Sequence, residues 1–200
     1  MKLLIASRNK DKISEIKDIL KDIDLEIITA LDFPNLHEVI EDKDTIEENA
    51  VKKAAECADF TGLLTIADDT GLFVETLDGE PGVYAARYAG KNCTYKDNRD
   101  KLLQNMKDKT NRKAEFRTVA ALASPVGLLG TANGKVDGKI THQEIGNQGF
   151  GYDAIFRADE TGKTFGEMTD KEKHKISHRG RAFRNIIPIL KDYLTQTPCL

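Results

Sequence analysis

Several short segments carry side chains that could bind and cut a phosphorylated substrate. Residues 7–12 lie between an apolar run and a series of isoleucines at helical spacing, so they connect a predicted strand to a predicted helix. Backbone N–H groups and the helix dipole favour an anion at such a position, and Lys12 adds a positive charge. The alternative is that Ser7 or Asn9 only caps the helix and that Lys12 is solvated.

Acidic side chains provide candidate ligands for a metal ion. Asp68 and Asp69 end a predicted buried strand, and because side chains alternate along a strand, at most one of them should face a given cleft. A carboxylate beside a triphosphate is unfavourable unless a cation lies between them, so this combination predicts Mg²⁺, for which Mn²⁺ could substitute. Glu41 has no evident role at a helix end and is a further candidate. The alternative for the two aspartates is a turn.

A third group of residues has the composition of a base-binding site. Residues 149–153 place two aromatic rings between glycines and end in a carboxylate, which could stack on a base and accept its N–H groups. Lys173, His178 and Arg179 supply donors for phosphate or for a purine oxo group. The alternatives are a strand whose aromatics pack in the core and a solvated run of charges. Taken together, the three groups predict a nucleotide site.

The surrounding pattern predicts the elements that must position these side chains. Helical spacing and capping signals predict helices over residues 13–23, 49–58, 94–106 and from about 177. The second has a capping box at Thr45 and Glu48, the third starts at Thr94 with Asp97, and the last contains Pro188. Apolar runs predict strands at 3–6, 25–29, 63–67, 116–123, 128–140 and 149–156. Residues 37–44 are predicted to form a mobile loop. This order indicates an α/β protein with a mixed sheet.

The composition agrees with one soluble domain. The 200 residues are 40% hydrophobic and 32% charged, and their net charge of −3 argues against a nucleic-acid partner. No apolar run approaches the roughly 20 residues needed to span a bilayer, and the apolar stretch at the N-terminus is too short for a secretory signal. Cys57, Cys93 and Cys199 have no metal-site or disulfide spacing. The sequence therefore predicts a cytoplasmic protein that does not bind a membrane.

Six strings extend these observations over about the whole chain: SRNKDK, EENAVKKA, IADDTGL, PGVYAARYAG, GFGYDAIF and EKHKISHRG. In their order and spacing the sequence resembles the inosine triphosphate pyrophosphatase family, also called XTP/dITP diphosphatases. The resemblance implies one domain over residues 1–200, with an elongated α/β/α fold, a central mixed β-sheet and a cleft between two lobes, and it implies a homodimer. It also implies hydrolysis of ITP, dITP and XTP to the nucleoside monophosphate and pyrophosphate.

The resemblance also implies roles for individual residues. Asp69 would be the general base and a magnesium ligand, Glu41 a second carboxylate at the metal, and Phe150 the ring that stacks on the base. The substrate would be held by Ser7, Arg8, Asn9, Lys10, Asp11, Lys12, Lys53, Thr70, Phe150, Gly151, Tyr152, Asp153, Lys173, His178 and Arg179. The sequence departs from the family pattern at Gln148, where many relatives have glycine, and at Ala154, where they usually have proline.

The implied reaction is attack by an activated water on the α-phosphorus, with Mg²⁺ and basic side chains neutralising the departing pyrophosphate. Donors around the purine 6-oxo group would reject adenine, whose amino group would leave them unpaired. Three other hypotheses stay open at this stage. They are a hydrolase of modified pyrimidine triphosphates, a nucleotide sensor without turnover, and a structural protein with acidic loops.

Overall fold

The computed structural model describes residues 1–196, so Cys199 lies outside the described part of the chain. The described chain forms two compact units. Unit 1 comprises Met1–Asp69, Thr118–Gly134 and the described part of Arg179–Leu200, and unit 2 comprises Thr70–Arg117 and Lys135–His178. The predicted mixed α/β fold is confirmed.

One seven-stranded sheet has the order β2-β1-β3-β5-β6-β7, with β4 paired to β3. Its strands are β1 (Lys2–Ile5), β2 (Glu26–Thr29), β3 (Leu64–Val74), β4 (Pro81–Gly82), β5 (Lys113–Ser124), β6 (Gly127–Ile140) and β7 (Phe156–Ala158). β1 is parallel to β2 and to β3, whereas β7 is antiparallel to β6. β3, β5 and β6 each contribute residues to both units.

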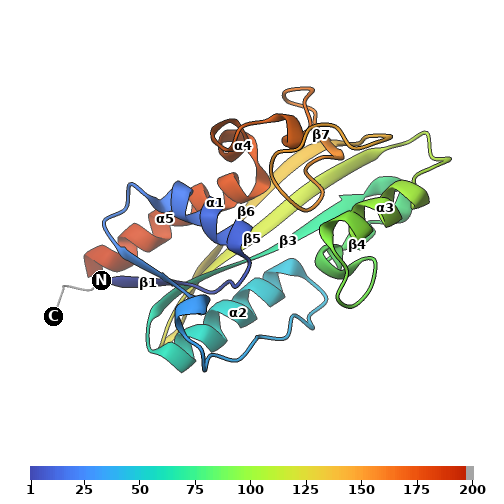
Figure 1. The fold of residues 1–200 in the computed structure, drawn as a ribbon. Helices are drawn as coiled ribbons and strands as arrows, with labels where there is room; N and C mark the ends of the chain where they lie inside the picture. The colour runs from blue at the N-terminus through green and yellow to red at the C-terminus, as the bar shows by residue number, and fades with distance from the viewer. Residues whose placement is uncertain (197–200) are drawn as a thin grey trace. The chain divides into compact units, whose positions relative to one another are not determined.

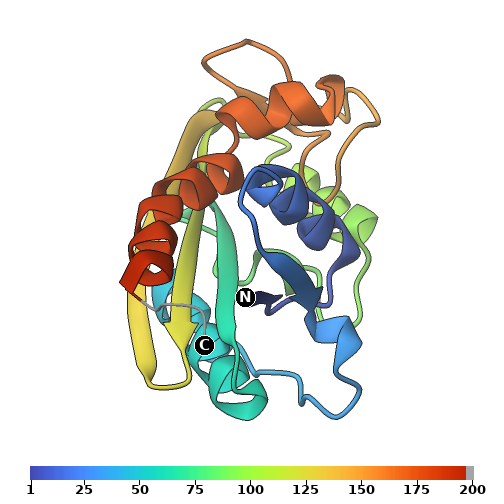
Figure 2. The same ribbon diagram turned by 90° about the vertical axis from the view of Figure 1, so that its left-hand side faces the viewer.

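Helices cover both faces of the strands in unit 1. α1 (Lys10–Leu20) and α5 (His178–Gln196) lie on one side and α2 (Ile46–Thr61) on the other (Figure 1), and α1 and α5 can be followed again in Figure 2. Ile5 and Ile66 belong to the same buried cluster as residues of α1 and α5. Because side chains alternate along a strand, Leu4 and Ala67, both buried, point to the face that α2 covers.

Local signals define the ends of these helices. The side chain of Asn9 accepts hydrogen bonds at the start of α1, and the Thr45 hydroxyl accepts one from the Glu48 N–H at the start of α2. α2 ends at Gly62, whose φ of 71° is in the left-handed region that glycine adopts readily. α5 continues through Pro188. The predicted helices therefore form, although α1 begins three residues earlier than the apolar spacing suggests.

Unit 2 has a core rich in aromatic rings. Phe116, Phe156 and Phe165 pack with ring centroids 4.7–6.1 Å apart. The helices of unit 2 are α3 (Tyr95–Asn105), which starts with the predicted capping box of Thr94 and Asp97, and α4 (Asp170–Ile176). Short 3₁₀ helices in the chain are η1 (Ala30–Asp32), η2 (Glu75–Leu77), η3 (Ala85–Arg87) and η4 (Phe165–Glu167).

Two predicted strand limits are wrong. β3 does not end before Asp68 but continues to Val74, and both aspartates are buried inside it. Residues 149–155 form turns rather than a strand, since Gly149 and Gly151 have φ values of 70° and 59° that break an extended backbone. Among the described residues, no helix is both long and apolar enough to cross a membrane.

Candidate functional site

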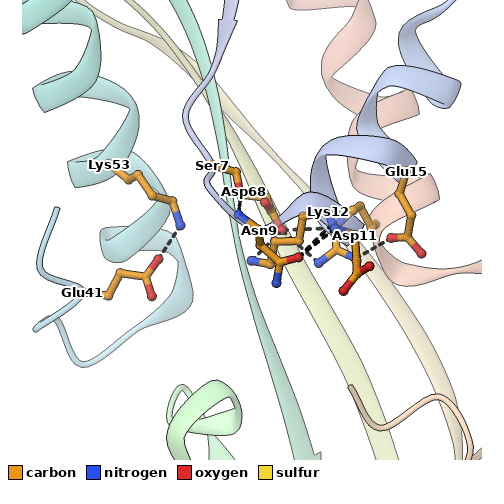
Figure 3. Close-up of polar contacts among 9 residues, drawn as sticks. Ser7, Asn9, Asp11, Lys12, Glu15, Glu41, Lys53 and Asp68 are labelled. Carbon is orange, nitrogen blue, oxygen red and sulfur yellow. Dashed lines mark hydrogen bonds and ion pairs between the residues drawn. The ribbon is translucent and has the colours of Figure 1, made fainter. Parts of the chain in front are cut away.

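The predicted phosphate-binding segment, residues 7–12, lies at the end of β1 in unit 1 (Figure 3). Asn9 Oδ1 accepts hydrogen bonds from the backbone N–H groups of Asp11 at 3.0 Å and Lys12 at 3.2 Å, so the capping interpretation of Asn9 is confirmed. The suggestion that Lys12 is solvated is wrong, because its ammonium lies 3.2 Å from the Asp68 carboxylate. Arg8 donates to the Leu36 carbonyl, while Lys10 is exposed.

Asp68 is the centre of a buried ion-pair network in unit 1. The Arg179 guanidinium lies 3.1 Å from Asp68 Oδ2 and donates a 2.6 Å hydrogen bond to Glu15, and all three side chains are at least 90% buried. Burial opposes ionisation of Asp68, but Lys12, Arg179 and Lys53 outweigh it and lower the pKa of this carboxyl. Two cations, Lys12 and Arg179, thus face two carboxylates.

Glu41 and Lys53 form a second ion pair beside this network. Lys53 projects from α2, contacts Glu41 in the preceding loop and is largely buried. Burial disfavours the ammonium, but the charges of Glu41, Asp68 and Asp69 outweigh it and raise the pKa of Lys53. Three carboxylates therefore act electrostatically on one ammonium.

The loop that carries Glu41 has no helix or strand, as predicted, but it is tied to α2. Lys52 donates to the Ile40 carbonyl at 2.8 Å and pairs with Asp42 at 2.7 Å. Asn49, buried in the first turn of α2, accepts a hydrogen bond from the Lys43 N–H at 3.0 Å. These contacts on both sides of Glu41 fix its position relative to Lys53.

The donor set in unit 1 fits Mg²⁺. Carboxylate oxygens are the ligands that Mg²⁺ prefers, and the ion commonly takes only one or two of them, with water and substrate phosphates completing its coordination. No cluster of three or more acidic, histidine or cysteine side chains with metal-site geometry occurs among residues 1–196. Glu41 and Asp69 are two carboxylates whose charges both act on the Lys53 ammonium. By strand alternation, Asp69 points to the α2 face and Asp68 to the opposite face.

The predicted base-binding residues come together in unit 2. Residues 146–151, with Arg99, Glu144, Asp153 and Ala154, line a pocket of about 240 Å³. Asp153 Oδ2 accepts from the Phe150 N–H at 2.8 Å and from the Lys173 ammonium at 2.5 Å. That ammonium lies 4.8 Å from the centre of the Phe150 ring. A side chain at Gly149 would meet Asp153 Oδ2 at 2.1 Å, so this turn requires glycine.

Other predicted residues lie elsewhere. The Tyr152 ring belongs to the core of unit 2 and its hydroxyl donates to the Ala85 carbonyl at 2.8 Å, so the core-packing alternative describes this aromatic residue but not Phe150. His178 is 97% buried and stacks on Phe116, with centroids 4.3 Å apart. Thr70 follows Asp69 in β3 and is partly buried. The solvated-charge alternative for Lys173, His178 and Arg179 is wrong, because all three are buried.

Sequence reasoning missed three residues beside these sites. Glu15 neutralises Arg179, and its place among the apolar residues of α1 was the available signal. Arg99 donates to the Gly151 carbonyl at 2.8 Å and pairs with Glu144, so it braces the pocket wall. Tyr95 packs against Phe150 with centroids 5.7 Å apart. Neither contact of α3 with residues 144–151 had a signal in the sequence.

Comparisons with known proteins give a consistent result. The model of the Ham1 family matches residues 3–189. The chain is 44% identical to a protein of Geobacter sulfurreducens named dITP/XTP pyrophosphatase, over 96% of both chains. It is also 44% identical to a protein of the same name from Desulfotalea psychrophila, over 92% of this chain and 82% of the relative. A solved HAM1 protein structure from Coxiella burnetii covers 96% of this chain and 99% of its own, with 34% identity and a TM-score of 0.86.

Proposed function

Because this chain belongs to the Ham1 family, we propose that it hydrolyses the non-standard purine nucleoside triphosphates dITP, ITP and XTP to the nucleoside monophosphate and pyrophosphate. The main support is that the relatives from Geobacter and Desulfotalea, each 44% identical to this chain, are named dITP/XTP pyrophosphatase. The removal of such nucleotides from the triphosphate pool would be its role.

The side chains of unit 1 have the chemistry that binding and cleavage of a triphosphate require. Lys12 and Lys53 are largely buried cations, each held at present by a carboxylate, and they would neutralise phosphate oxygens once a substrate is bound. Mg²⁺, or Mn²⁺ in its place, would be held by Glu41 and Asp69 and would supply positive charge to the triphosphate when bound. Asp69 would accept the proton of the attacking water.

The Arg179 guanidinium is held by two buried carboxylates. Its hydrogen bonds to Glu15 and Asp68 leave it little freedom to follow a ligand. Its contribution to substrate binding would therefore be electrostatic and positional, through the orientation of Asp68 and hence of Lys12. Residues 7–12 would lie along the phosphates.

The pocket in unit 2 provides a basis for choosing the purine. Phe150 would stack on the base, and the ion pair of Lys173 with Asp153 would present one donor and one acceptor. A 6-oxo group accepts a hydrogen bond and the adjacent ring N–H donates one, so hypoxanthine and xanthine match this pair. Adenine has the reverse pattern and would set its amino group against the ammonium and its ring N1 against the carboxylate, which is strongly unfavourable. Guanine shares the oxo group, so its 2-amino group must be rejected by shape or by an unsatisfied donor.

We also infer that the protein acts in the cytoplasm as a homodimer and that its ligands are small nucleotides rather than nucleic acids. The net charge of −3 supports the last point. Analytical ultracentrifugation tests the dimer, and a sedimentation coefficient of a 22 kDa monomer at micromolar concentration would contradict it.

One experiment tests the activity. The purified protein is incubated with dITP, ITP, XTP, GTP, ATP and dUTP, with Mg²⁺ and with EDTA, and the products are separated by anion-exchange chromatography. We expect monophosphate and pyrophosphate from dITP, ITP and XTP only, and only with the metal. Nucleoside diphosphate and phosphate as products, a preference for dUTP, or no turnover would each contradict the proposal.

A further inference from the structure

A second pocket in unit 2 is lined by positive charges and by no acidic side chain. It has a volume of about 580 Å³ and lies where the start of β5, the end of β6 and β7 come together. We call it the basic pocket. It shares no residue with the pocket beside Phe150, and its lining residues are 110–113, 139–143, Ile145 and Arg157.

Three exposed cations of the basic pocket have no carboxylate partner. Lys113, Lys139 and Arg157 form no ion pair within 4.0 Å anywhere in residues 1–196. The pKa of Glu167 is lowered mainly by the backbone N–H of Thr164 and to a smaller extent by the charge of Arg157. Arg157 nevertheless forms no ion pair with Glu167. The chain as a whole is acidic, so this concentration of positive charge is local.

A fourth cation, Arg112, is built into the pocket wall. Arg112 is 91% buried and its guanidinium donates to four backbone carbonyls, those of Ile140 at 2.6 Å, Thr141 at 2.7 Å, Met106 at 2.8 Å and Lys109 at 3.4 Å. Burial lowers the pKa of Arg112, and no neighbouring carboxylate opposes that shift. A buried charge is normally balanced by a counter-ion. Within residues 1–196, the positive charge of these four cations is therefore not balanced by a carboxylate.

The strand register adds an independent sign that an anion belongs here. Lys139 of β6 lies directly opposite Arg157 of β7 in an antiparallel pair, and like charges in that position destabilise a sheet. Lys135, four residues earlier in β6, contacts Glu115 at 2.5 Å and Asp137 at 3.0 Å instead. On the exposed side of β6, Lys135 is therefore neutralised by carboxylates and Lys139 is not. An anion bound between Lys139 and Arg157 would remove the repulsion.

We propose that the basic pocket binds a small, multiply charged phosphate compound, at a site separate from the residues assigned above to nucleotide hydrolysis. Its volume is within the range of about 300–1,000 Å³ that is usual for small-ligand sites. Lysine and arginine side chains are the usual ligands of phosphate groups. An extended nucleic acid fits less well, because the exposed side chains of Asp137 and Asp159 lie next to the cations along β6 and β7 and would repel it.

The test is isothermal titration calorimetry with inorganic tripolyphosphate in the presence of EDTA. Tripolyphosphate contains no nucleobase, so it cannot bind through base stacking in the pocket beside Phe150. The test variant is Lys139→Ala with Arg157→Ala, and the control is Lys91→Ala with Lys163→Ala, which removes two exposed cations of the same unit outside the pocket. We expect the test variant to weaken one binding site at least tenfold, because each cation supplies a charge-assisted contact. The control should change this affinity less than threefold.

Further outcomes are decisive. Any binding at residues 7–12 would persist in the test variant as a separate site. The single change Arg157→Lys should keep most of the affinity that Arg157→Ala loses, since it preserves the charge. Equal affinities for the wild type and the test variant, or equal losses in the test variant and the control, would overturn the proposal. So would a single-stranded RNA that binds through Lys139 and Arg157 and that tripolyphosphate fails to displace.

Discussion

The ion pair between Arg179 and Glu15 allows a quantitative test of the buried network in unit 1. We consider the change Glu15→Gln, which keeps the shape of the side chain and an oxygen that can accept from the guanidinium, but removes the charge. In the wild type, two cations and two carboxylates balance one another within this network. The variant leaves one buried positive charge without its counter-charge.

The magnitude follows from burial. The side chains of Arg179 and Glu15 are 3% and 8% exposed, so solvent screens their interaction little. A hydrogen bond to a charged buried group contributes about 1.5–3 kcal/mol to stability. Because Arg179 keeps its contacts with Asp68, we expect Glu15→Gln to lower the free energy of unfolding by about 2 kcal/mol. For a chain of this size that corresponds to a decrease in Tm of about 4–8 °C.

Urea denaturation followed by circular dichroism measures this difference. The matched control is Glu26→Gln, which removes the same charge from the pair with Lys2, whose side chains are 52% and 60% exposed; it should change stability by less than about 0.5 kcal/mol. A double-mutant cycle of Glu15→Gln with Arg179→Met should give a coupling energy of about 1.5 kcal/mol. If Glu15→Gln is no more destabilising than the control, the network does not stabilise unit 1 as argued.

Three further predictions concern the site and its acid sensitivity. Asp69→Asn should lower kcat for XTP about 10²- to 10⁴-fold with KM little changed, because it removes the proposed base. Steady-state kinetics at saturating Mg²⁺ measure this, and a retained kcat would contradict the role of Asp69. Phe150→Ala should raise KM for XTP about tenfold, because stacking on the base is lost. Tyr152→Phe removes only the hydrogen bond to the Ala85 carbonyl, so it should leave KM unchanged and lower the free energy of unfolding by about 1 kcal/mol. Equal KM values for the two variants would contradict the different roles of Phe150 and Tyr152. Burial opposes the ionisation of Asp68, but the charges of Lys12, Arg179 and Lys53 outweigh it and lower the pKa of this carboxyl in the folded protein. The unfolded chain therefore binds the proton first as pH falls below about 4, and the free energy of unfolding should decline there. Urea midpoints that stay constant between pH 5 and pH 3 would contradict this.

The sequence predicted best those features that depend on neighbours in the chain. The caps at Thr45 and Thr94 were identified because each involves a side chain and an N–H group three residues apart. The strand containing Asp68 was predicted too short because acidic residues normally end a buried strand. Its continuation depends on Arg179, 111 residues away, which no local pattern reveals.

The candidate site shows the same limit. The residue types around Asp69 and Phe150 were found from composition and from the family resemblance, but their partners were not. Glu15 and Arg99 act through contacts 164 and 52 residues away. Whether a charged side chain is solvated or buried depends on such distant contacts, which is why Lys12 and Lys173 were assigned solvated alternatives that the structure does not support.

The way the chain divides between the units constrains the order in which the protein can fold during synthesis. The strands β1, β2 and the first part of β3 are made early, but Phe183, Ile186 and Leu190 of α5, which are fully buried in the same core, are made last. At about 5–20 residues per second, the ribosome needs on the order of 5–20 s between residue 69 and residue 179. Throughout that interval the apolar face of the early strands has α1 but lacks α5, so unit 1 can complete its core only after α5 has left the ribosome.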